Sequence, residues 1–375
     1  MSTDEDKEYD AILVDTSIFD RNGLRLEKGL LGKLNQFKDS NIYYLLPDVI
    51  EGEIKSHLEK KVKSSRASLE KAISDADDHL FFDGSELNDA RPIVIDDDKI
   101  GRVAENRLNK FIANTGALVL ECGNYVSITK LLKQYFQSEP PFSETGDKKS
   151  EFPDAIVLLA TEAWAREKNI QVLAVAGDRD WKNYCEISTH IDFTDDFANA
   201  LSQFNKATAP FAFLSLLAQA IKSNDSKANI FVNKISNEIR GYFYDFIPEI
   251  EANSSHHWEE YCSHGWLTNF ELANQDFKII DHDKDYVVLE VNANFEVRVE
   301  GDFSLAHYDS IDRDYVPLKT ITRIVDKKFT SEILITVRGD LTGDLAGLEI
   351  EEIEVVNPLA LVDFGALELN YDEDG

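Results

Sequence analysis

The stretch "YDAILVDTSIF", Tyr9 to Phe19, has the pattern of an apolar β-strand that ends at Asp15 and leads into helical sequence. A second apolar strand, "NIYYLLP", closes at Pro47. The segment that follows, "DVIEGEIKSHLEKKV", has the pattern of a helix with Asp48 as its N-cap. This alternation of strand and helix predicts an α/β fold built on a parallel sheet.

The same alternation continues to about residue 205. Residues 56–135 are mostly helical in pattern and are interrupted by a loop at 82–98, so we expect a helical insertion beside the sheet. The amphipathic helix "DAIVLLATEAWAREKN" then leads into a third strand, "IQVLAVAGD". Because Pro153 stands directly before this helical run, we expect Asp154 to lie in the first turn of the helix.

The character of the chain changes after residue 205. Two helical segments, 211–223 and 228–247, come first. From about residue 270 onward, runs such as "DYVVLEVNANFEVRVEGDF" and "TSEILITVRGDL" alternate apolar with charged residues. This period of two predicts an antiparallel sheet with one solvated face, and therefore a second, β-rich α+β domain.

Composition limits the class of protein. The chain of 375 residues is 43% apolar, which is enough for two folded domains, and contains no run of about 18 apolar residues that could cross a membrane. Its three cysteines are widely separated, which favours free thiols, and we expect a cytoplasmic protein without membrane association. The formal charge of −31 opposes non-specific phosphate binding, so any nucleic acid must be bound locally.

Acidic side chains gather at the predicted carboxyl ends of the strands, where parallel α/β sheets place their sites. Each of these acids could instead be a helix cap or a turn residue. Taken together, carboxylates brought close in one cleft favour a bound cation, and oxygen ligands without His or Cys favour Mg²⁺ or Mn²⁺ over zinc. The acids are Asp15, Glu53, Asp154, Asp178 and Asp180.

The ordered set "LVDTSIF", "LPDVIEGEIKSHL", "KKSEFPDAIVLL" and "LAVAGDRDW" resembles the PIN domain family of metal-dependent nucleases, in a large branch with a helical insertion. The resemblance covers about residues 9–195. It implies that Asp15 and Glu53 are the first two metal-binding acids, with Glu51 as the competing assignment for the second. It also implies a PIN-like α/β/α sheet and ribonuclease activity directed at single strands.

The remaining acids and the hydroxyls follow from the same resemblance, whereas the basic stripe follows from the charge pattern of the helical segment 53–71. Asp154 matches the acid that opens the later helix, Asp178 matches the acid after the last main strand, and Asp180 resembles an auxiliary catalytic acid. A hydroxyl near the metal and a basic stripe on a helix are expected to contact the substrate. These substrate-binding candidates are Thr16, Ser17, Lys149, Lys60, Lys61, Lys63 and Arg66.

Our leading hypothesis is a divalent-metal-dependent endoribonuclease, a hydrolase that cuts RNA phosphodiester bonds, in a setting such as a toxin or an antiviral effector. The alternatives are a DNA nuclease that acts on flaps or single strands, and a catalytically silent PIN-like scaffold for a basic protein. A regulatory protein partner and a homo-oligomer are left open. We expect three parts: a PIN-like nuclease domain at 1–205, a helical connector at 206–255 and a β-rich domain at 256–375.

Overall fold

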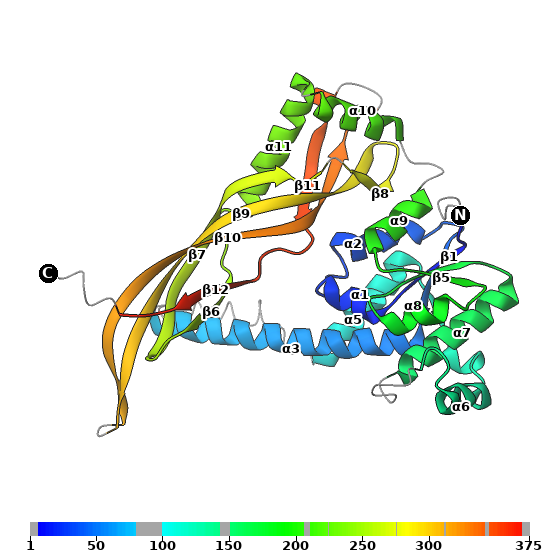
Figure 1. Cartoon of the computed structure of the whole chain (residues 1–375), viewed down its shortest axis with the longest axis horizontal. Helices are drawn as coiled ribbons and strands as arrows, with labels where there is room; N and C mark the ends of the chain where they lie inside the picture. Colours follow the sequence, from blue (N-terminus) through cyan, green and yellow to red (C-terminus); the bar gives the residue numbers. More distant parts are fainter. Residues whose placement is uncertain are drawn as a thin grey trace. The chain divides into compact units, whose positions relative to one another are not determined.

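The computed structural model describes residues 7–79, 100–142, 151–205, 211–223, 225–274, 276–310, 313–341 and 345–369 (Figure 1). The chain divides into two compact units, Met1–Phe204 and Asn205–Gly375. The loop predicted at 82–98 and the candidate residue Lys149 lie outside the described residues. No helix in the described part of the chain has the length and apolar character needed to span a bilayer.

The first unit is built on a parallel sheet of five strands in the order β3-β2-β1-β4-β5. All residues of β1 and β4 are buried, so helices cover both faces of the sheet, and the predicted α/β/α fold with a parallel sheet is confirmed. The strands are β1 (Ala11–Val14), β2 (Tyr43–Pro47), β3 (Leu118–Leu120), β4 (Val172–Val175) and β5 (Ile191–Thr194).

Helices connect and cover these strands. The longest is α3, which has 32 residues and packs against α5. The helices of this unit are α1 (Thr16–Arg21), α2 (Gly29–Gly32), η2 (Lys33–Phe37), α3 (Asp48–His79), α5 (Ile100–Thr115), η3 (Cys122–Asn124), α6 (Ile128–Gln137), α7 (Phe152–Lys168), α8 (Arg179–Cys185) and α9 (Phe197–Asn205).

The edge strand β3 was missed by the sequence analysis. It lies within the region 56–135, which was expected to be mostly helical. Three residues are too few to show the period of two, and Leu118 and Val119 are exposed as edge residues, so neither alternation nor burial marks the segment.

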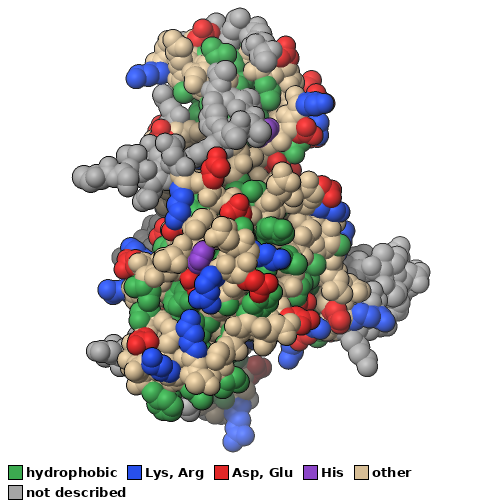
Figure 2. All heavy atoms as spheres, turned by 90° about the vertical axis from the view of Figure 1, so that its right-hand side faces the viewer, with side chains coloured by type: hydrophobic (Ala, Val, Ile, Leu, Met, Phe, Trp, Pro, Cys, Tyr) green, Lys and Arg blue, Asp and Glu red, His purple; other side chains and the backbone are tan. Residues whose placement is uncertain are grey.

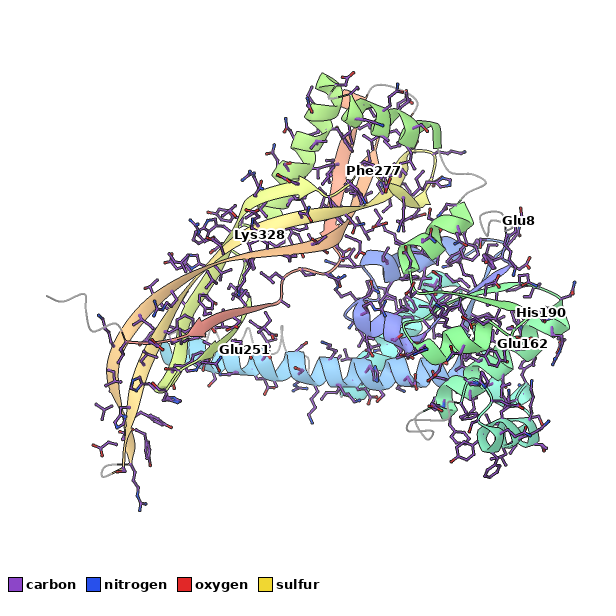
Figure 3. All side chains as sticks on the ribbon, viewed as in Figure 1. Glu8, Glu162, His190, Glu251, Phe277 and Lys328 are labelled. Carbon is purple, nitrogen blue, oxygen red and sulfur yellow. The ribbon has the colours of Figure 1, made fainter. Side chains whose placement is uncertain are left out.

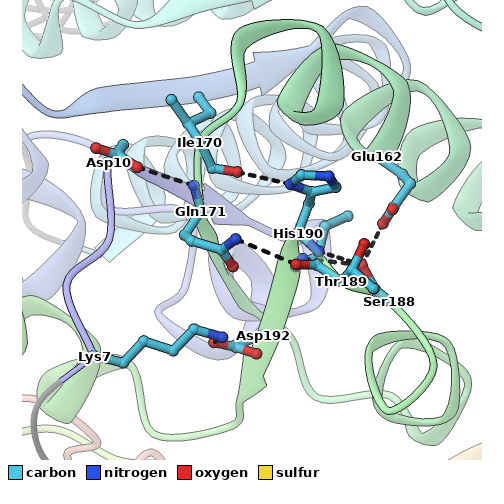
Figure 4. Close-up of polar contacts among 10 residues, drawn as sticks. Lys7, Asp10, Glu162, Ile170, Gln171, Ser188, Thr189, His190 and Asp192 are labelled. Atoms are coloured by element: carbon cyan, nitrogen blue, oxygen red, sulfur yellow. Dashed lines mark hydrogen bonds and ion pairs between the residues drawn. The ribbon is translucent and has the colours of Figure 1, made fainter.

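Polar contacts hold the amino ends of the strands together (Figure 4). Gln171 lies just before β4 and Asp10 lies just before β1. The backbone N–H of Gln171 donates a hydrogen bond to Asp10 Oδ2 at 2.9 Å. The Ser188 hydroxyl donates to the carboxylate of Glu162 and accepts the N–H of His190 at 3.2 Å. These contacts fix loops at the edge of the sheet opposite the carboxyl ends, and we assign them a structural role.

The second unit contains the predicted antiparallel sheet, with strands in the order β11-β10-β9-β7 and β8 paired to β9. The segment at 361–366, also expected to be antiparallel, instead pairs in parallel with β6 as β12. The strands are β6 (Glu249–Asn253), β7 (His257–Leu272), β8 (Lys278–His282), β9 (Tyr286–Asp309), β10 (Asp314–Arg338), β11 (Glu349–Val355) and β12 (Leu361–Ala366).

Period-two alternation sorts the side chains of this sheet. Phe295 of β9 and Phe277 are buried in one hydrophobic core, to which α10 (Phe211–Lys222) and α11 (Ser226–Tyr242) also contribute; η4 (Leu345–Gly347) lies before β11. On the other face, Lys328 of β10 is exposed and forms an ion pair with Glu296 of β9 (Figure 3). The predicted solvated face of the sheet is therefore present.

Candidate active site

The carboxyl ends of β1 and β4 lie side by side. Val14 and Val175 are paired in the parallel register, and the backbone N–H of Asp15 donates to the carbonyl of Val175 at 2.9 Å. Asp15 therefore leaves the sheet next to the loop that leads to Asp178. Strand pairing alone brings these two acids, 163 positions apart in the chain, to one edge.

Asp15 has both a structural contact and an unfavourable electrostatic environment. Its carboxylate caps α1 by accepting the N–H of Ser17 at 3.1 Å and the Ser17 hydroxyl, and that hydroxyl accepts the N–H of Gly177 at 3.1 Å. Burial nevertheless raises the pKa of Asp15, against the opposing hydrogen bonds from Ser17, and the charge of Asp178 raises it further. Asp15 therefore does cap α1, but the capping hydrogen bonds do not compensate for the unfavourable free energy of burying its charged carboxylate.

Glu53 reaches the same edge from α3. The hydroxyl of Thr16, the residue after Asp15, donates to Glu53 Oε2 at 2.7 Å. The charge of Glu53, one of the two candidate acids of α3, raises the pKa of Asp154. The structure thus brings Glu53 together with the other acids.

Asp154 lies in the first turn of α7, as predicted from the proline before it. Its pKa is raised to about 7, chiefly by burial and in addition by the charges of Asp15, Glu53 and Asp178, against an opposing hydrogen bond from Trp181. Acids from four separate elements are therefore close enough to repel one another.

Trp181 was missed by the sequence analysis. Its side chain is completely buried in α8, and its indole Nε1–H donates to Asp154 Oδ1 at 2.9 Å. An indole has one donor and no acceptor, so it can only stabilise the oxygen that it meets. The available signal was an aromatic residue three positions after Asp178, but spacing cannot show which carboxylate it reaches.

Two further acids lie beside this group. Burial raises the pKa of Asp180, and the charges of Glu151 and then Asp178 add to the shift. Glu151, which precedes α7 and is buried, was not among the predicted residues. Asp178 occupies the N-cap position of α8, and the described contacts include no capping hydrogen bond from its side chain.

The predicted basic stripe is only partly intact. Lys60, Lys61 and Lys63 are exposed on α3, whereas Arg66 forms an ion pair with Glu70 at 3.2 Å. Hydrophobic, basic and acidic side chains alternate over the end of the first unit that is drawn in Figure 2, so no single sign of charge dominates that face.

The acids fit Mg²⁺ or Mn²⁺ by their chemistry, since they are all oxygen donors whose mutual repulsion a divalent cation would relieve. Among the described residues, no group of three or more His, Cys, Asp or Glu side chains is arranged so that it could hold a metal ion as it stands. Instead, Asp15, Glu53 and Asp154 each use one oxygen to accept a hydrogen bond from Ser17, Thr16 or Trp181.

The family model of the PIN domain matches residues 12–181, a range that begins within β1 and extends to Trp181 in α8, so it includes all of the acids described above. PIN domains are generally nucleases. Neither the curated proteins nor the solved structures contain a significant match to the chain.

Proposed function

Residues 12–181 belong to the PIN domain family, and from this premise we propose that the protein is a divalent-metal-dependent endoribonuclease. The observation that carries the proposal is the convergence of Asp15, Glu53 and Asp154 at the carboxyl ends of β1 and β4, where burial and the neighbouring carboxylates also raise the pKa of Asp154 to about 7. A folded protein gains nothing by burying mutually repelling acids, and such perturbed groups are typical of functional sites. A Mg²⁺ or Mn²⁺ ion offsets this cost.

In this proposal Asp15, Glu53, Asp154 and Asp178 hold the metal, and Asp180 assists from the first turn of α8. When bound, such an ion activates water and stabilises the charge that develops on the phosphodiester oxygens. Neighbouring residues orient three of these carboxylates, because each donates a hydrogen bond to one oxygen of Asp15, Glu53 or Asp154, and the other oxygen of each would be available to hold the ion. These orienting residues are Thr16, Ser17 and Trp181.

The enzymatic test compares substrates under Mn²⁺. Purified protein is incubated with end-labelled single-stranded RNA and with DNA of the same sequence, and we expect cleavage of the RNA within the strand. Asp154→Asn removes one charged ligand and should lower the rate about 100-fold or more. The matched control is Asp39→Asn, which removes a carboxylate from an exposed turn of the same unit and should cleave normally.

Three results would redirect the proposal. Cleavage of the DNA alone would show a deoxyribonuclease, the first alternative. Equal cleavage by the wild-type protein and the Asp154→Asn variant would count against the proposed enzyme and favour the silent scaffold. Binding of a basic protein without any cleavage would favour the silent scaffold. The setting as a toxin or antiviral effector stays a prediction, which expression of the wild-type protein and the variant in growing cells would test.

The stripe on α3 supplies a local route for an anionic strand in an acidic chain. Lys60 follows Glu53 by seven residues, which is close to two full helical turns, and Lys63 follows Lys60 by three. Glu53, Lys60 and Lys63 therefore lie on one side of α3. We propose that RNA phosphates contact these lysines beside the acids. Arg66 is left out of this proposed set because its guanidinium pairs with Glu70.

Salt dependence tests the stripe independently of cleavage. Replacing Lys60 and Lys63 with Glu should weaken RNA binding and lower the slope of log K against log salt by about 1.4, since each lost phosphate contact on a single strand is worth about 0.7. Arg66→Glu is the matched control on the same helix and should leave the slope nearly unchanged. A slope unaffected by the double substitution would place the RNA elsewhere.

A further inference from the structure

The guanidinium of Arg21 packs directly on Gly177, in the loop between β4 and α8. An ideal Cβ atom at position 177 would lie 2.3 Å from Arg21 Nη2, far inside any allowed contact. The glycine therefore makes room for this cation. Arg21 is otherwise exposed, at the end of α1, so a ligand can reach it.

This contact lies within the acidic edge of the sheet. Gly177 is followed by Asp178, and its N–H donates to the Ser17 hydroxyl at 3.1 Å; that hydroxyl in turn donates to Asp15. A cation in the last turn of α1 is favoured by the helix dipole, which accounts for a basic residue there. The dipole does not account for a guanidinium seated on the residue that precedes Asp178.

We propose that Arg21 binds a non-bridging phosphate oxygen of the nucleic-acid strand next to the acids. The inference rests on the proposed nuclease function and assigns a residue that neither the sequence pattern nor the family match singled out. A planar guanidinium offers paired N–H donors that match a phosphate group. An anionic strand that approaches several carboxylates is repelled unless positive charges lie beside them. The guanidinium of Arg21 supplies such a positive charge from the protein's own side chains.

Gly177→Ala provides a second way to remove the contact. The backbone at Gly177 lies outside the left-handed region, so alanine is tolerated there, and the nearest obstacle is the flexible end of Arg21. The added methyl group should therefore displace the guanidinium while the fold is kept. The next obstacle, Ser17 Oγ at 3.3 Å, needs to move only a few tenths of an ångström.

The experiment measures binding of a fluorescein-labelled single-stranded RNA by anisotropy over a range of salt concentrations, with Ca²⁺ as the divalent ion and the RNA checked for integrity. Arg21→Ala and Gly177→Ala should each weaken binding about 5- to 10-fold and lower the salt slope by about 0.7, the value for one phosphate contact on a single strand. The double variant should bind like Arg21→Ala. Arg166→Ala, which removes an exposed arginine from the far end of α7, is the charge-matched control.

The cycle of variants separates the possible causes. If Arg21→Ala binds RNA as tightly as wild type, the phosphate contact is refuted. If the losses from Arg21→Ala and Gly177→Ala multiply, alanine weakens binding independently of the guanidinium, and the role assigned to the Arg21–Gly177 contact is refuted. The proposed function survives that result as long as Asp154→Asn abolishes cleavage. Wild-type protein that neither binds nor cleaves nucleic acid would overturn both.

Discussion

Asp154→Asn should make the metal-free protein more stable at pH 8, although most substitutions of partly buried residues destabilise. The ionised carboxylate is disfavoured in the folded state, where burial and its acidic neighbours raise the pKa to about 7 from a usual value of 3.8. Asparagine has the same shape and carries no charge. Its amide oxygen can still accept the indole N–H of Trp181, which lies 2.9 Å from Asp154 Oδ1.

The magnitude follows from the pKa shift. A difference of about 3 units at about 1.4 kcal/mol each sets an upper bound of about 4 kcal/mol, and solvent screening at a partly exposed carboxylate lowers the expected gain to about 2 kcal/mol. In the unfolded chain Asp154 loses its proton near pH 4, whereas the folded protein keeps it to about pH 7. The wild-type protein therefore loses stability as the pH rises from 4 to 7, and the advantage of the variant grows over that window.

The assay is urea unfolding in EDTA at pH 4.5, 6 and 8, followed by circular dichroism. The variant should exceed the wild type by about 2 kcal/mol at pH 8 and by little at pH 4.5. Adding Mn²⁺ at about 100 times its Kd should stabilise the wild type by about 2.7 kcal/mol and the variant much less. A variant that is less stable than wild type at pH 8 would refute the reasoning, because Asp154 would then be a stabilising helix N-terminal acid.

Two further substitutions test other contacts. Trp181→Phe keeps the buried ring but loses the N–H that orients Asp154, so Mn²⁺ affinity measured by calorimetry should fall about 10-fold; an unchanged affinity would assign the indole to packing alone. Gly265→Ala would place a methyl group 2.5 Å from the ring of Phe246 and should lower the thermal midpoint of the second unit, at a cost of about 1–3 kcal/mol. An unchanged midpoint would show that the ring has room to move. W164F is the control for Trp181→Phe, because it replaces another buried tryptophan. G241A is the control for Gly265→Ala, because an added Cβ at Gly241 meets nothing within 4 Å.

The sequence predicted more of the site than of its surroundings. Asp15 and Asp154 were identifiable because each stands at a boundary between strand and helix, which local patterns reveal. Trp181 and Glu151 could not be assigned in this way, because their relevance depends on which carboxylate each one approaches in space. The contact between Arg21 and Gly177 could not be predicted from the sequence for the same reason.

By itself, the sequence determined the strand–helix alternation around β1, β2 and β4, the antiparallel sheet of the second unit, and the presence of acids at the ends of strands, since hydrophobic period and helix-start signals are local. Only the tertiary structure decided which acids repel one another. It brought the charge of Glu53 near Asp154, and it paired β12 with β6 in parallel. Coulomb energy depends on distance through space, and that distance is set by strand register and helix packing between segments far apart in the chain.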